Sequence, residues 1–208
     1  MVIEAYLSAA GTVAELLRSR ALAATWSSPS ALAEFRVSGL AGHLGRGVFT
    51  VEKYLAAPLP DGPATTFDAA GYFDAVTAVA GPDDDRQIRE RGEQDAGTGP
   101  ADLAARYDAA LDRLRGVLPG LPPDRPVPMV GGRVLPLSEC LLTRLVELLV
   151  HADDLAVSIG VTPPEFAAEP ADLVVSVLAR AARRRHGTAA VLRALARRER
   201  ATGTVAAF

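Results

Sequence analysis

Apolar residues recur along this chain at intervals of three and four, and prolines and glycines separate one such run from the next. This spacing places apolar side chains on one face of a helix, while proline and glycine end helices. The first run extends from Val2 to about Ala24. The second extends from Gly39 to about Leu55, with Ser38 as its predicted N-cap. Five further helical runs are Thr65–Ala80, Ala101–Val117, Glu139–Ser158, Ala171–Arg185 and Val191–Arg198. Ser138 is the predicted N-cap of the run that begins at Glu139.

The segments between these runs contain little regular pattern. Residues 83–99 are rich in charge and glycine, which predicts a partly helical surface excursion. Residues 126–137 place Gly131 and Gly132 between two short β-prone runs, which predicts a loop or a small hairpin. Few residues are aromatic, so Leu, Val and Ala must fill the core, and this favours helices. We predict a mainly all-α fold, a four-helix bundle over residues 1–162, with a short helical extension over residues 163–208 packed on it.

Charge and hydropathy limit the kinds of binding partner and the cell compartment that we expect for this protein. The 22 basic and 25 acidic residues are scattered, so no strong field would attract nucleic acid or an anionic membrane. The most apolar stretch, Leu141–Val157, contains charged side chains, so no membrane span is predicted. Residues 1–10 lack the basic and apolar pattern of a signal peptide, and the single cysteine fits a reducing compartment. We predict a cytoplasmic monomer or homodimer that acts on small molecules.

The helical run that begins near Glu139 has its polar residues on a narrow arc. At about 100° per residue, they fall within roughly one third of the circumference. Glu147 and His151 are four positions apart, so their side chains can converge on one ion. The alternative is that the arc is simply a solvent face with exposed ion pairs. The polar residues are Cys140, Thr143, Arg144, Glu147, His151, Asp154 and Ser158.

The chain has only three histidines, which makes their positions informative. His43 lies beside the apolar stripe of the second helical run, and such a histidine is either a structural residue or a ligand. His186 ends a run of arginines and is predicted to be an exposed helix end. Together, His43, Glu147 and His151 form a candidate divalent-metal site. Imidazole and carboxylate suit zinc, with nickel or another first-row metal as alternatives, and three protein ligands leave one position open.

Other polar residues near these three are candidates for further roles. Arg144 and Asp154 are candidates for contacts to the ligands or to a substrate, because ligand histidines usually need an outer partner. Cys140 is on the same arc, but a lone helical cysteine is typically a small core residue. Arginines after residue 171 either bind the carboxylates of a ligand or are simply solvated. Phosphate loops, serine-hydrolase elbows and paired CxxC motifs are absent from the sequence.

Three parts of the sequence resemble the mycothiol-dependent maleylpyruvate isomerase family of the DinB-like group. These are Trp26-x-x-Pro29-Ser30, the segment from Val37 to Leu44, and the string R-x-x-E-x-x-x-H-x-x-D-L-A that begins at Arg144. The resemblance spans about residues 5 to 160. It implies a DinB-like four-helix bundle that holds a divalent metal, usually zinc, through His43, Glu147 and His151.

The resemblance also implies an activity. In this family the metal binds the thiol of mycothiol, a small thiol of actinobacteria, and lowers its pKa, as cations do for coordinated anions. The thiolate then attacks a small electrophile, either adding and leaving again in an isomerase or remaining attached in a transferase. Because only a short segment follows Pro163, where the isomerases have a further α/β domain, we expect a broader thiol transferase. The alternatives are a non-catalytic helical protein that binds a small molecule or partner, and a metal-dependent hydrolase with Asp154 as its base.

Overall fold

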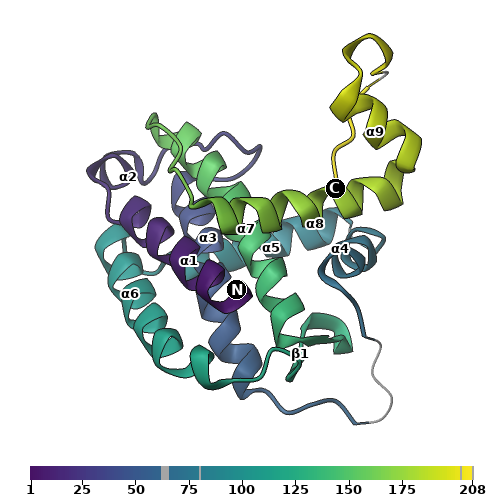
Figure 1. Cartoon of the computed structure of the whole chain (residues 1–208). Coiled ribbons are helices and arrows are strands. Elements are labelled where there is room, and N and C mark those ends of the chain that lie inside the picture. Colours follow the sequence, from purple (N-terminus) through teal and green to yellow (C-terminus); the bar gives the residue numbers. More distant parts are fainter. Residues whose placement is uncertain (62–65, 80, 202, 208) are drawn as a thin grey trace.

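A computed structural model describes residues 1–61, 66–79, 81–201 and 203–207 (Figure 1). Four helices form its bundle: α1 (Val2–Leu17), α3 (Val37–Ala56), α6 (Pro100–Val117) and α7 (Leu137–Ile159). Both α1 and α3 pack against α6 and α7, and leucines with small residues fill the shared core. The predicted mainly helical fold is therefore confirmed.

The helix starts differ from those predicted. The first predicted helix is two helices, because α1 ends at Leu17 and α2 (Arg20–Thr25) begins after Ser19, whose Oγ accepts a hydrogen bond from the Leu22 backbone at 3.2 Å. The predictions of Ser38 and Ser138 as N-caps are wrong, since α3 begins at Val37 and α7 at Leu137, so that both serines lie inside the first turn. Ser38 instead donates its hydroxyl proton to Glu93, at 2.9 Å. A distant carboxylate thus replaces the local capping bond.

Helix α4 (Ala69–Thr77) lies within the third predicted run, whose ends at Thr65 and Ala80 are outside the described residues. Asp68 caps it by accepting a hydrogen bond from the Gly71 backbone at 2.7 Å. The next segment was predicted to be only partly helical, but α5 (Pro82–Ala96) is one continuous helix.

Helix α5 is strongly polar, and glycine contacts hold it against α3. A Cβ added at Gly42 would overlap the carbonyl oxygen of Gly92 and lie 2.5 Å from the backbone nitrogen of Ala96. The two backbones therefore meet directly, and an ion pair between Arg46 and Asp95 at 2.5 Å joins the helices further along. Apolar spacing in the sequence does not indicate such a backbone contact, which explains why this segment was predicted to be only partly helical.

After α6 and the short 3-10 helix η1 (Leu118–Gly120), the predicted small hairpin forms. Strands β1 (Pro126–Pro128) and β2 (Val134–Pro136) pair antiparallel, with Val127 opposite Leu135. Their connection, η2 (Val130–Gly132), contains two glycines with φ of 74° and 72°, which glycine adopts readily. Gly160, with φ of 69°, ends α7 as predicted.

The C-terminal helices are α8 (Ala168–His186) and α9 (Thr188–Ala196), followed by η3 (Arg198–Arg200). Helix α8 packs against α1, α4 and α7, whereas α9 extends away from the bundle (Figure 1). The division at residues 162 and 163 stays a prediction. In the described part of the chain, every helix is too short or too polar to cross a bilayer.

Candidate metal centre

The centre of the proposed site lies where α3 crosses α7. His43 comes from α3, and Glu147 and His151 lie one turn apart on α7. Gly47 allows the two helices to approach here, because a Cβ at this position would lie 2.6 Å from the side chain of Leu148. The structure therefore brings together the three residues that the sequence singled out.

The ligand atoms of these residues converge on one point. The Nε2 atoms of His43 and His151 each lie 3.4 Å from the same oxygen, Oε2 of Glu147. All three ligand atoms are within 4.8 Å of one another. Ligands about 2.0–2.2 Å from a tetrahedral zinc ion are themselves about 3.4 Å apart. Two imidazole nitrogens and one carboxylate oxygen at this spacing fit a first-row divalent metal.

The three side chains are partly buried and remain accessible to solvent. Those of His43, Glu147 and His151 are 16%, 23% and 21% exposed, respectively. Burial raises the pKa of Glu147, but hydrogen bonds with His151 and His43 and the charge of Arg144 outweigh it. The pKa of Glu147 therefore lies well below its usual value, and this carboxylate is ionised, as a metal ligand must be.

Asp154 orients one of the two histidines. Its Oδ2 lies 2.9 Å from Nδ1 of His151, which leaves Nε2 directed at the centre. Burial lowers the pKa of His151, but hydrogen bonds with Asp154 and Glu147 outweigh it and raise the pKa to about 9. The Nδ1 atom of His43 is buried and has no hydrogen-bond partner among the described residues. Both histidines contact Glu147 through Nε2, but only His151 also has a carboxylate at Nδ1.

Arg144 links this centre to the protein interior. Its side chain is only 10% exposed, its Nε donates to Oγ1 of Thr143 at 3.1 Å, and its Nη2 lies 4.0 Å from Oε1 of Glu147. Thr143 and Cys140 are fully buried. The polar arc of α7 therefore faces the protein along the stretch before Glu147, and the solvent-face interpretation of the whole arc is wrong.

The remaining cysteine and histidine lie outside the centre. The Sγ of Cys140 is 3.4 Å from Sδ of Met129, and burial raises the pKa of this thiol to about 11, so it stays protonated. His186 contacts the carbonyl oxygen of Ala206 at 2.7 Å, at the end of α8. The interpretations of Cys140 as a core residue and of His186 as a helix end fit these positions.

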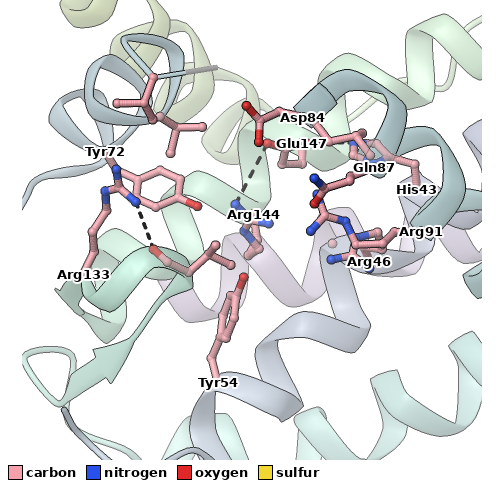
Figure 2. A pocket seen from close by; sticks show the side chains of 15 residues that line it. His43, Arg46, Tyr54, Tyr72, Asp84, Gln87, Arg91, Arg133, Arg144 and Glu147 are labelled. Atoms are coloured by element: carbon pink, nitrogen blue, oxygen red, sulfur yellow. Dashed lines mark hydrogen bonds and ion pairs between the residues drawn. The ribbon is translucent and has the colours of Figure 1, made fainter. Parts of the chain in front are cut away.

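A pocket of about 340 Å³ opens beside His43 and Glu147 (Figure 2). Its walls come from α3, α4, α5, α7 and the hairpin turn, and they include arginine and tyrosine side chains. Sequence reasoning missed all of these side chains except Arg144, because the others lie on different elements and share no spacing motif. Tyr54 left a weak signal, since it follows His43 on the same face of α3 by about three turns. The missed residues are Arg46, Tyr54, Tyr72, Arg91 and Arg133.

The arginines after residue 171 are not part of this pocket. Arg184 of α8 forms ion pairs with Asp68 at 2.8 Å and with Asp74 at 3.3 Å. These bonds attach α8 to α4. The interpretation of these arginines as a carboxylate-binding group therefore has no support at this pocket, whose arginines come from earlier elements.

A four-helix bundle with two histidines and a glutamate converging from two packed helices defines a class of helical protein with a candidate divalent-metal centre. The model of the family described as Mycothiol maleylpyruvate isomerase N-terminal domain matches residues 7–156, and the chain belongs to this family. The matched range includes all three candidate ligands. No significant match was found among curated proteins or among solved structures.

Proposed function

We propose that this protein is a divalent-metal-dependent enzyme that uses a small thiol, mycothiol, against a small electrophilic metabolite. The observation that supports it best is the convergence of His43, Glu147 and His151 beside a pocket that His43 and Glu147 line. A structural metal would need a fourth protein ligand, whereas three ligands beside a pocket leave a position for a substrate.

His43, Glu147 and His151 would hold the metal, with zinc favoured by this donor set. When bound, the metal supplies a cation that lowers the pKa of a coordinated thiol. Asp154 fixes the tautomer and orientation of His151 through Nδ1. Arg144, close to the other oxygen of Glu147, helps to keep that carboxylate ionised.

The chemistry of the reaction follows from a nucleophilic thiol. The thiol loses its proton and its sulfur forms a bond to an electrophilic carbon. As this bond forms, the π bond of an activated carbon–carbon double bond breaks. In a transferase the neighbouring carbon then takes up a proton and the carbon–sulfur bond remains. In an isomerase the carbon–sulfur bond breaks again after rotation, and the double bond re-forms as the thiolate leaves. Family membership supports this class of reaction, and both outcomes require the same thiol and the same pocket.

Metal content tests the centre. We expect near-stoichiometric metal, by inductively coupled plasma mass spectrometry, in protein purified without a histidine tag or chelator. His151→Ala should lose that metal, while His186→Ala, a matched histidine outside the centre, should keep it. Absence of metal from the wild-type protein would contradict the proposal.

Thiol consumption tests the activity. We expect metal-dependent loss of free mycothiol in the presence of suitable electrophiles, and we expect His151→Ala to abolish it. Full metal occupancy without thiol-dependent turnover across a broad electrophile panel would favour a non-catalytic binding protein instead. The hydrolase alternative has less support, because Asp154, the base predicted for it from the sequence, is engaged with His151 at 2.9 Å.

A further inference from the structure

Two tyrosines in the pocket have hydroxyl groups without a hydrogen-bond partner in the part of the chain that the structure describes. Tyr54 of α3 and Tyr72 of α4 line the pocket, and each is only 7% exposed. Within the described residues, no hydrogen bond engages either hydroxyl. In Figure 2 both hydroxyls point toward the guanidinium of Arg144. Both residues are largely buried, but their hydroxyl oxygens are open to the pocket. A largely buried tyrosine normally has a hydrogen-bond partner for its hydroxyl, so hydroxyls that face a pocket indicate a ligand with acceptor atoms.

Both hydroxyls remain donors at neutral pH. Burial is the main cause that raises the pKa of Tyr54 and of Tyr72, and it outweighs the opposing charge of Arg144. Each phenol therefore keeps its proton and can donate it in a hydrogen bond. A ligand at this point must supply acceptor atoms.

Arg144 adds a cation to the same place. The residue is only 8% exposed, and of its five N–H donors only the one on Nε has a hydrogen-bond partner within the described part of the chain. Its nearest carboxylate oxygen, Oε1 of Glu147, is 4.0 Å away. The other oxygen of Glu147 faces the two histidines. The Glu147 side chain therefore lies between the metal centre and Arg144.

A second arginine lies near this group at the hairpin turn. Arg133 donates to the carbonyl oxygens of Val130 at 3.1 Å and Ala75 at 3.2 Å, and it forms no ion pair within the described ranges. Arg46, by contrast, is neutralised by Asp95. The wall with Tyr72 and Arg133 is therefore positive and rich in donors.

We infer that Tyr54, Tyr72 and Arg144 form a subsite that binds a carboxylate group of the electrophilic substrate. Two hydroxyl donors and a buried guanidinium match the charge and the acceptor oxygens of a carboxylate. Apolar side chains elsewhere in the pocket suit a short hydrocarbon body, and they are Val76, Val79, Ile88 and Val130. The positions and chemistry of these side chains support a carboxylate subsite by themselves. Its assignment to the electrophilic substrate rests on the proposed function.

Binding of hexanoate and hexanamide to the zinc-loaded, full-length protein tests the subsite. The two probes have similar size but differ in charge, and isothermal titration calorimetry or ligand-observed NMR gives their Kd values. We expect hexanoate to bind at least tenfold more tightly than hexanamide. The Tyr54→Phe/Tyr72→Phe double variant should reduce this ratio by at least tenfold, because it removes two charge-assisted hydrogen bonds and keeps both rings.

Two controls make the result specific. Arg113→Gln removes an exposed arginine outside the pocket, and it should leave the ratio unchanged. The double variant should keep its zinc, which separates loss of the subsite from loss of the metal. An unchanged ratio in the double variant would overturn the inference, since the carboxylate would then bind elsewhere, the metal included.

The same assay separates this inference from the proposed function. Tyrosine-dependent preference for hexanoate in a protein without thiol turnover would support the subsite and contradict the proposed reaction. Thiol turnover with a tyrosine-independent ratio would support the reaction and overturn the subsite.

Discussion

Two neighbouring aspartates on α7 have different surroundings and provide a matched pair. Asp154 holds Nδ1 of His151 at 2.9 Å, whereas Asp153 is exposed. Asp154→Asn should weaken metal binding by about 10- to 100-fold, as loss of an outer partner typically does. Competition with a chromophoric chelator measures this affinity. Asp153→Asn should bind metal like the wild type, and equal affinity of both variants would contradict a positioning role for Asp154.

The pKa of His151 predicts how the stability of the metal-free protein depends on pH. Burial opposes its charge, but hydrogen bonds with Asp154 and Glu147 raise its pKa from 6.5 to about 9. Folding therefore favours the protonated form, and this stabilisation is complete below pH 6.5 and is lost as the pH rises through about 9. We expect the free energy of unfolding to fall over that range, by at most about 1.4 kcal/mol per pH unit.

Urea unfolding of chelator-treated protein at several pH values checks this expectation. His151→Gln should remove most of the slope, because the variant lacks the imidazole whose pKa folding raises. A stability that rises from pH 6.5 to 9 in the wild type would show that His151 folds in its neutral form.

At the scale of elements, direct backbone contact between α3 and α5 positions the wall of the pocket. A methyl group at Gly42 would overlap the Gly92 carbonyl, and backbone cannot move aside as a side chain can. We expect Gly42→Ala to lower the free energy of unfolding by about 1–3 kcal/mol. Gly116→Ala is the control, because its added Cβ would have no atom within 4 Å apart from its chain neighbours and the backbone of its own helix.

Urea unfolding distinguishes these two variants. Gly116→Ala, in α6, should stabilise the protein by about 0.5–1 kcal/mol through its better helix propensity. Wild-type stability in Gly42→Ala would mean that α5 does not contact α3 in this way.

At the scale of the whole molecule, a metal would join α3 to α7 across a long stretch of sequence. Binding only to the folded state should stabilise it by about 2.7 kcal/mol when free metal is 100 times its Kd. For a chain of this size the Tm should rise by about 5–10 °C. Differential scanning calorimetry with and without a chelator measures the shift, and His43→Ala should abolish it. A chelator-independent Tm in the wild type would indicate that no metal is bound.

Local sequence patterns determined the helical fold and one half of the candidate centre. Apolar spacing of three and four predicts helices whatever their packing, and Glu147 and His151 are brought together by helix geometry alone. The glycine pair at the hairpin turn and Gly160 at the end of α7 are local signals of the same kind. The histidine count then suggested His43 as the third ligand, and the resemblance to the family supported it.

Tertiary structure decided everything that depends on how the helices face one another. The hydroxyl of Ser38 does not cap its helix and instead donates a hydrogen bond to Glu93 of another helix. Helix α5 packs against α3 through direct backbone contact. Because this contact needs no apolar side chains, the α5 sequence shows no apolar periodicity. Tyr54, Tyr72 and Arg144 line the same pocket only because α3, α4 and α7 surround it. Periodicity fixes the face that each side chain occupies on its own helix, and only packing fixes the rotation of one helix against the next.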